Sequence, residues 1–295
     1  MSTCRLLLQP KAFVLPVLPV VRLITLTQYR IASVISKDQM QEPLRRLYLL
    51  YHELRPSESQ YSYVVDTRMF EKHIDLFVRL RQAESPSLWP EVTFDDGHIS
   101  NFEFAAPILQ SRDLTARFFI TVGWTGKKPG YMGWPELRSL QEAGQSIGAH
   151  GWTHTLLTHC GERELHTELN SARLTLEDKL GTAITTMSLP GGRYNHRVLT
   201  ACEKAGYTQV FSSIPRAEPV PIGTLVGRLN IRGDMQLDWI SDLFQPNSSV
   251  LHNLARQYRM KATAKTLLGD RLYEKLWAVL NRKEPDSYDG RDSAE

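Results

Sequence analysis

Residues 91–97 read EVTFDDG, and this stretch gives the most direct indication of the fold. Its apolar half, residues 91–94, predicts a buried β-strand, and two aspartates and a glycine stand where that strand ends. A carboxylate at the end of a buried strand is costly unless a partner compensates its charge. The sequence therefore predicts that Asp95 and Asp96 meet compensating groups in the folded chain.

Two histidines, His150 and His154, follow later in the segment IGAHGWTH. Two neutral imidazoles and one carboxylate are a usual open ligand set for a catalytic divalent metal ion. A second carboxylate beside that set is then available to move protons. The aspartate pair and the histidine pair together indicate a metal-dependent enzyme.

Short apolar segments alternate with helical patterns along most of the chain, which indicates a parallel βαβ architecture. The predicted strands are residues 47–51, 91–94, 116–121, 146–149, 186–189, 209–212 and 225–231. The predicted helices are residues 67–82, 101–111, 134–143, 162–180 and 195–205. About seven βα units in one domain fit a small (β/α) barrel, in which the chemistry lies where strands end. Five polar or turn residues fall at such ends: His52, Asp95, Asp96, His150 and Pro190.

Composition and charge favour a globular protein and argue against a nucleic-acid-binding one. The 295 residues, 42% hydrophobic and 23% charged, are typical of a globular chain with a core of ordinary size. A formal charge of +3, without a Lys/Arg run beside aromatics, argues against nucleic-acid binding. The cysteines, Cys4, Cys160 and Cys202, form no CxxC pair. A reduced compartment such as the cytoplasm is therefore favoured, while membrane association and export stay open.

Three segments are expected along the chain. Residues 1–45 are predicted to be a disordered or loosely packed leader, because the apolar part, 12–26, is too short and broken for a membrane span. Residues 46–245 should form the barrel. Residues 246–295 should form a basic helical extension with a polar tail. The amphipathic pattern over 249–282 is typical of a helix packed on the barrel, with weak contact to a membrane or protein as the alternative.

Three motifs follow one another along the chain: TFDDG at 93–97, His150-x-x-x-His154, and Pro-Gly-Gly at 190–192. In these motifs the sequence resembles the polysaccharide deacetylases, the NodB-homology domains of carbohydrate esterase family 4, over residues 47–232. The resemblance implies an α/β fold, a distorted (β/α)7 barrel, to which this chain adds C-terminal helices. It also implies a metal ion, usually zinc, and removal of acetyl groups from N-acetylated, sometimes O-acetylated, sugars. The substrate class it favours is a bacterial exopolysaccharide or cell-wall glycan.

The resemblance also implies roles for individual residues. Asp96, His150 and His154 would hold Zn²⁺ or another divalent transition metal and leave positions for water and the acetyl oxygen. Asp95 would be the general base that takes the proton of that water. His159 could be an additional ligand, but its surroundings are typical of a polar loop.

The third motif departs from the family, in which an arginine orients the base aspartate. Here the motif begins with Ser188, and Arg228 in a late predicted strand is the candidate replacement. The aromatic residue of the family motif contributes a backbone N–H to an oxyanion site, and Gly191 retains that N–H. A glycine at this place should also widen the cleft, which leaves room for a different selection of substrate.

The general acid of the family is a histidine at the end of an apolar run near the C-terminus. In this chain His252 lies in a helical pattern, whereas the apolar run at 47–52 ends in His52. The chain thus resembles the circularly permuted members, including the poly-N-acetylglucosamine deacetylases, and His52 is the predicted acid. Since closing a barrel makes its first and last strands neighbours, permutation can preserve the site. The alternative for His52 is a strand-end histidine hydrogen-bonded to a loop.

Two other functions stay open. One is a metal-dependent amidase or esterase that acts on another small substrate. The other is a degenerate domain that binds glycan without turnover. The missing motif arginine favours the degenerate domain, whereas the presence of Asp95 and of all three predicted metal ligands opposes it.

Overall fold

The computed structural model describes residues 44–268, with the exception of residues 58, 60 and 84–87. The chain divides into two units after Glu42, and every described residue belongs to the second unit. The predicted leader, residues 1–45, therefore lies almost entirely outside the described residues. The same holds for the part of the C-terminal extension that follows residue 268.

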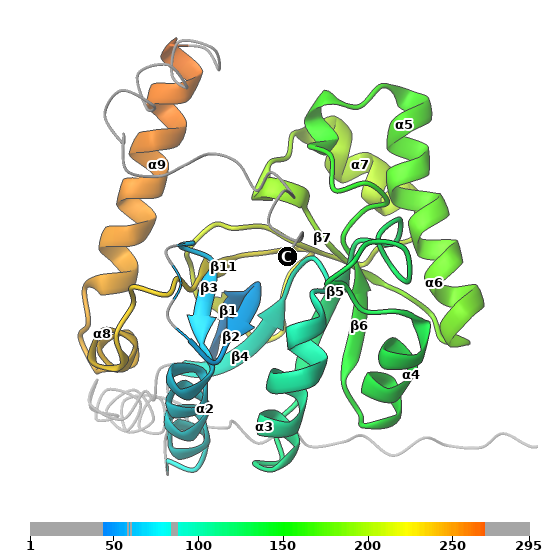
Figure 1. Ribbon diagram of the computed structural model, residues 1–295. Helices are drawn as coiled ribbons and strands as arrows, with labels where there is room; N and C mark the ends of the chain where they lie inside the picture. Colours follow the sequence, from blue (N-terminus) through cyan, green and yellow to red (C-terminus); the bar gives the residue numbers. More distant parts are fainter. Residues whose placement is uncertain (1–43, 58, 60, 84–87, 269–295) are drawn as a thin grey trace, which may run out of the picture. The chain divides into compact units, whose positions relative to one another are not determined.

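Eight strands follow one another around a sheet that is nearly closed on itself (Figure 1). In spatial order they are β10 (Leu225–Val226), β8 (Gln209–Phe211), β7 (Thr186–Ser188), β6 (Ser146–Ala149), β5 (Ala116–Ile120), β4 (Leu88–Phe94), β1 (Arg45–Tyr51) and β11 (Arg228–Asn230). Each pair of neighbours in this order is parallel. The predicted fold class, a distorted α/β barrel, is confirmed.

One segment, residues 225–230, closes the ring. Its first part, β10, pairs with β8, and its second part, β11, pairs with β1. Gly227 separates the two parts, and a Cβ atom there would lie 2.5 Å from the carbonyl oxygen of Ile214. The strand predicted at 225–231 is thus present but interrupted, because the backbone passes close to another segment at this point. Counted as one interrupted strand, it reduces the eight strands of the ring to the predicted seven.

Helices connect the strands, and each predicted helix is present with ends within one residue of the prediction. They are α2 (Thr67–Arg81), η2 (Asn101–Ala105) with α3 (Ala106–Gln110), α4 (Trp134–Glu142), α5 (Glu162–His166) with η4 (Thr167–Ser171) and α6 (Ala172–Leu180), and α7 (His196–Lys204). Figure 1 shows α2, α3, α4 and α6 outside the strands. Two of the predicted helices contain a π-helical turn, η2 and η4, which periodicity alone does not reveal.

The ends of the helices have local causes. The Asp66 side chain caps α2 by accepting hydrogen bonds from the backbone N–H groups of Arg68 and Met69, at 2.9 and 3.2 Å. Gly181 ends α6 with a φ of +70°, a left-handed conformation that glycine adopts without steric cost. These short-range signals explain why the helix boundaries could be predicted.

Several short elements have no counterpart in the sequence prediction. β2 (Glu53–Arg55) and β3 (Val64–Asp66) form a separate parallel sheet, β9 (Glu218–Pro219) pairs antiparallel with β1, and α8 (Leu237–Asp242) follows the barrel. Strands of two or three residues are too short to show a periodic pattern. Since β2 begins directly after His52, that histidine is the single residue between two strands.

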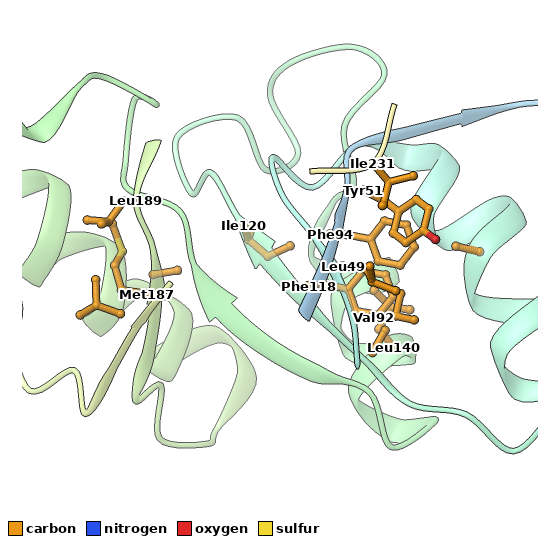
Figure 2. Close-up of a cluster of buried hydrophobic side chains, with 14 of the residues drawn as sticks. Leu49, Tyr51, Val92, Phe94, Phe118, Ile120, Leu140, Met187, Leu189 and Ile231 are labelled. Carbon is orange, nitrogen blue, oxygen red and sulfur yellow. The ribbon is translucent and has the colours of Figure 1, made fainter. Parts of the chain in front are cut away.

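Alternate residues of the barrel strands face two apolar regions. Leu49, Phe94 and Phe118 belong to a large cluster that also contains buried residues of α2 and α4 (Figure 2). A smaller cluster, on the opposite side of the sheet, consists of Tyr48, Phe119, Phe211 and Val226. Burial of each large apolar side chain contributes about 1.5–3 kcal/mol. Because the helices lie on the side of the large cluster, the smaller cluster fills the interior of the barrel.

The last described element, α9 (Val250–Leu268), lies within the basic helical segment predicted at 249–282. Val250, Leu251 and Leu254 pack against the hydrophobic core. Across the described residues, no helix has the length and apolarity needed to cross a membrane. Contact of α9 with a membrane or a protein stays a prediction.

His73 is an ionisable residue in the core, on the inner face of α2. It is fully buried, and its Nδ1 atom lies 3.1 Å from the hydroxyl oxygen of Tyr51. Burial lowers the pKa of His73 to about 4, whereas an unfolded histidine has a pKa of about 6.5. Between these pH values the unfolded chain binds a proton that the folded protein does not bind.

We predict that this difference destabilises the protein as the pH falls from about 6.5 toward about 4. The loss in the free energy of unfolding should reach about 3 kcal/mol. The variant His73→Gln has no titrating group at this place, so its free energy of unfolding should depend less on pH. Urea denaturation of both proteins at about pH 7.5 and about pH 4.5 measures the difference. An identical pH dependence in the two proteins would contradict the assignment.

Candidate active site

The polar residues singled out in the sequence lie at the carboxyl ends of barrel strands. His52 follows β1, Asp95 and Asp96 follow β4, and His150 follows β6. Because these strands are parallel, their carboxyl ends share one rim of the barrel. The fold thereby gathers residues that are far apart in the sequence.

Asp96, His150 and His154 converge on one point. The Oδ1 atom of Asp96 lies 3.3 Å from the Nε2 atoms of both histidines, and the candidate ligand atoms are all within 4.8 Å of one another. Asp96 Oδ1 is buried and has no hydrogen-bond partner in the part of the chain that the structure describes. Burial disfavours the charged carboxylate, but the two histidines outweigh it and hold the pKa of Asp96 well below its ordinary value. A buried, unpaired carboxylate oxygen that faces two imidazole nitrogens fits a divalent transition metal ion.

The backbone of two candidate ligands adopts an unusual conformation. Asp96 has a φ of +72° and His154 a φ of +65°, in the left-handed region that non-glycine residues rarely occupy. Such a conformation costs about 1–3 kcal/mol and persists only where the surrounding structure enforces it. The strain indicates that the positions of these side chains are held at some expense of stability.

His150 is oriented by the strand next to its own. Its Nδ1 atom donates a hydrogen bond to the backbone carbonyl of Ser188, at 2.9 Å. The proton on Nδ1 leaves the lone pair of the neutral ring on Nε2, the atom that faces Asp96. The backbone N–H of His150 donates to the carbonyl of Ile120, at 2.8 Å. Both the tautomer and the direction of this ring are therefore fixed by neighbouring strands.

Asp95 forms a buried ion pair with Arg228. The guanidinium donates from Nη1 to Oδ1 at 2.7 Å and from Nη2 to Oδ2 at 2.8 Å, and Arg228 is fully buried. The Ser188 hydroxyl donates to Asp95 Oδ2, at 2.8 Å, and accepts from Arg228 Nη2, at 2.7 Å. Burial disfavours the charged form of Asp95, but Arg228 more than compensates, so the pKa of Asp95 lies below its ordinary value. Asp95 is thus an oriented, ionised carboxylate.

His52 lies beside the converging ligands and is partly exposed. Its backbone carbonyl accepts a hydrogen bond from the side-chain amide of Asn101, at 2.7 Å. Its ring lies 5.0 Å from the ring of Tyr63, and its Nδ1 atom is buried without a hydrogen-bond partner among the described residues. Burial lowers the pKa of His52, while the charges of Asp96 and Asp95 act in the opposite direction. His52 also lines the adjoining cavity, so a molecule bound there would contact it.

That cavity has a volume of about 270 Å³, small for a ligand site. Its lining residues are His52, Glu53, Tyr61, Asp96, His98, Trp124, Lys128, Tyr131 and His154. The Trp124 ring lies 5.2 Å from that of His154, and the Lys128 ammonium lies 3.7 Å from the centre of the Trp124 ring. The sequence motifs did not predict this wall. An aromatic and lysine-rich loop directly after β5 is the signal that could have pointed to it.

Three other residues considered in the sequence analysis lie apart from this cavity. Gly191 is exposed in the turn η5 (Pro190–Gly192), where a Cβ atom would lie 2.7 Å from the Leu156 side chain. His159 is exposed at the end of η3 (Leu157–His159), and His252 is exposed on α9. Within the described residues, none of the three lines the cavity.

The sequence matches a family profile and a named bacterial protein, and both are described as polysaccharide deacetylases. Residues 90–210 match the profile of the polysaccharide deacetylase family. Over 192 residues the chain is 26% identical to "Putative polysaccharide deacetylase YxkH" of Bacillus subtilis (strain 168). That match covers 60% of this chain and 67% of the Bacillus protein.

Solved structures with the same fold include two proteins of low sequence identity to this chain. The deacetylase PplD of Streptococcus pyogenes, solved with acetate, has a TM-score of 0.61 at 19% identity and covers 69% of this chain and 100% of its own. IcaB of Ammonifex degensii has a TM-score of 0.57 at 20% identity, with coverage of 70% and 99%. At these identities the similarity supports the fold, a NodB-type barrel.

We predict that the protein binds about one Zn²⁺ per chain, as expected for three protein ligands with open positions. Asp96→Ala and His150→Ala should each abolish stoichiometric binding, because each removes one of the converging ligand atoms. His159→Ala is the matched control, since it removes an exposed histidine that lies outside the ligand set. Elemental analysis after zinc loading and desalting gives the stoichiometry. Unchanged metal content in Asp96→Ala, or loss of metal in His159→Ala, would show that the ligands are wrongly identified.

Proposed function

Because the chain belongs to the polysaccharide deacetylases, hydrolases of non-peptide carbon–nitrogen bonds, we propose that it removes acetyl groups from N-acetylated sugars of a polysaccharide with the help of a bound divalent metal. The observation that carries this proposal is the position of Asp95. An ionised carboxylate, fixed by Arg228, stands next to three converging metal-ligand side chains. This is the combination that metal-assisted hydrolysis of an amide requires.

Asp96, His150 and His154 would hold the metal, which we propose to be Zn²⁺. When bound, the ion supplies Lewis acidity toward the acetyl carbonyl and acidifies a water molecule. The histidine donors suit zinc and other late transition metals better than Mg²⁺ or Ca²⁺, which prefer oxygen ligands.

Asp95 is the proposed general base. Three hydrogen bonds from Arg228 and Ser188 occupy three of the about four lone-pair sites of its carboxylate. One site, on Oδ1, stays available to accept a proton from the attacking water. The pairing with Arg228 also makes Asp95 a weaker base, so proton transfer depends on the acidity of that water. Arg228 thus orients the base and keeps it free of a proton.

His52 is the proposed general acid. It lines the same cavity as Asp96 and His154, and its Nδ1 atom lacks a partner in the described part of the chain. An imidazolium there could deliver a proton to the amine nitrogen as the carbon–nitrogen bond breaks. The backbone N–H of Gly191 remains the proposed donor to the oxyanion, on the grounds of the sequence motif alone.

The surface next to His52 favours a polymeric substrate. The ring of Tyr63 lies 5.0 Å from that of His52, and the ring of Tyr61 lies 5.6 Å from that of Tyr63, measured between ring centroids. The two tyrosines are 37% and 39% exposed, which is unusual for large aromatic side chains. Aromatic surface at the mouth of a cavity can bury the apolar face of a sugar ring. We infer that a second sugar unit contacts these tyrosines while the acetylated unit occupies the cavity.

A non-catalytic glycan-binding domain is the less favoured alternative. Its main support is the missing arginine of the third motif, but Arg228 makes the corresponding ion pair with Asp95. If the protein were instead an amidase for small substrates, it would hydrolyse simple amides but not acetylated glucosamine oligomers. Assays on both substrates therefore distinguish this alternative from the proposed function.

Asp95→Asn should keep the metal but lower the deacetylation rate on N-acetylglucosamine oligomers by about 10²–10⁴-fold, the usual contribution of acid–base catalysis. The reason is that Asp95 moves a proton and is not one of the converging ligands. The measurement is acetate release at saturating substrate, with metal content determined on the same preparation. Retained turnover together with lost metal would mean that the roles of Asp95 and Asp96 are reversed.

His52→Ala should lower kcat on an amide substrate more than on an activated acetyl ester, because an activated alkoxide leaves without a proton. Metal content should stay unchanged, since His52 is not among the converging ligands. His252→Ala is the matched control, because His252 is exposed on α9 away from the cavity. Comparison of acetate release from both substrates checks the prediction. If His252→Ala has the larger effect, the acid lies in the C-terminal region.

A further inference from the structure

The loop at 151–153 connects the two histidines of the candidate metal site. On one side, its carbonyl groups accept hydrogen bonds from the backbone of the segment after β5. Val122 N–H donates to the carbonyl of Gly151 at 3.1 Å, and Gly123 N–H donates to that of Trp152 at 2.8 Å. A Cβ atom at Gly123 would lie 2.4 Å from the Trp152 carbonyl oxygen, so the two backbones are in direct contact. The carbonyl side of the loop is therefore fixed by main chain.

The N–H side of the same loop is fixed by a single side chain, the carboxylate of Glu168. Its Oε2 atom accepts from the N–H of Trp152 at 2.7 Å. Both of its oxygens lie 3.1 Å from the N–H nitrogen of Thr153, and Oε1 accepts from the Thr153 hydroxyl at 2.6 Å. Glu168 is only 3% exposed. A buried carboxylate that accepts several hydrogen bonds from one loop holds that loop strongly, because charge-assisted hydrogen bonds are about twice as strong as neutral ones.

Two features of the backbone make room for this carboxylate. A Cβ atom at Gly151 would lie 2.6 Å from Glu168 Oε2, and the φ of +76° favours glycine, so a side chain at this position would displace the carboxylate. Glu168 itself lies in η4, the π-helical turn that joins α5 to α6 in one continuous helix (Figure 1). π-turns inside helices are uncommon and occur frequently at functional sites. The helix departs from regular geometry where its side chain meets the loop.

The loop in turn determines the backbone of His154, which has a φ of +65°. A strained residue keeps its conformation only if its neighbours are held, and Trp152 and Thr153 directly precede it. His150 has a different support, the carbonyl of Ser188. The ring of His154 contacts the ring of Trp124, but its main chain depends on the loop that Glu168 holds.

We propose that Glu168 is a positioning residue of the metal site, which holds His154 in place for metal binding through the N–H groups of Trp152 and Thr153. This role rests on the proposed metal-dependent function. Without the carboxylate, the backbone N–H groups of Trp152 and Thr153 lose their acceptor, and the loop can relax away from the strained conformation. The ligand set would then lose its geometry while the barrel around it persists.

The test compares Glu168→Gln with Glu164→Gln. The glutamine at 168 keeps the size of the side chain, but its amide group cannot accept from the loop N–H groups as both carboxylate oxygens do. Glu164 is the matched control: it lies on α5, is exposed, and its carboxylate accepts from the N–H of Gly161 at 2.9 Å. Zinc affinity, measured by competition with a chromogenic chelator, should weaken by about 10–100-fold in Glu168→Gln and stay unchanged in Glu164→Gln.

Two further measurements separate positioning from general stability. The visible absorption spectrum of each protein saturated with Co²⁺ should change in Glu168→Gln, because it reports ligand geometry, and should match the wild type in Glu164→Gln. If Glu168→Gln does not fold, Thr153→Val removes one hydrogen bond to the carboxylate and should weaken zinc binding to a smaller extent. A lower melting temperature with unchanged zinc affinity and unchanged Co²⁺ spectrum would overturn the proposal. Wild-type protein that binds no metal would overturn the proposed function as well.

Discussion

The buried ion pair between Asp95 and Arg228 is the interaction on which the rest of the site depends. Two charges inside a barrel are costly to desolvate, and the cost is offset only when geometry and further hydrogen bonds are good. Here the contact is bidentate, Ser188 bonds to both partners, and Arg228 Nε donates to the carbonyl of Ser212 at 3.1 Å. The guanidinium also lies over the rings of Phe119 and Phe211 in the barrel interior. The pair therefore joins the closing segment of the barrel to the ends of β4, β7 and β8.

The same network couples the proposed base to the proposed metal ligands. Ser188 contributes its hydroxyl to the ion pair and its carbonyl to His150, so one residue of β7 orients both groups. The Nε2 atom of His150 lies 3.9 Å from Asp95 and 3.3 Å from Asp96. A shift of β7 would thus move a ligand and the base together. This arrangement keeps their separation constant, which catalysis by positioned groups requires.

Around this network, several features lower the stability of the fold while they hold the side chains of the site in position. Asp96 and His154 have left-handed backbones, Asp96 Oδ1 is unpaired among the described residues, and Glu168 is buried as a carboxylate. Each of these features would be unfavourable in a protein selected for stability alone. These features lie at the converging side chains or at the loop that connects the two histidines, which is the pattern expected of a functional site.

The sequence by itself determined the framework of this protein. The barrel strands and the helices that connect them follow from hydrophobic periodicity, helix caps and glycine stops, which act between residues close together in the sequence. The motifs also singled out Asp95, Asp96, His150 and His154. The sequence named Arg228 as a candidate partner of Asp95, but the tertiary structure decided the pairing, because the two residues meet only when the barrel closes. The break at Gly227, the π-turn that carries Glu168 and the wall formed by Trp124 and Lys128 likewise depend on contacts between segments distant in the chain. Local sequence patterns do not predict contacts between distant segments, so these features are seen only in the tertiary structure.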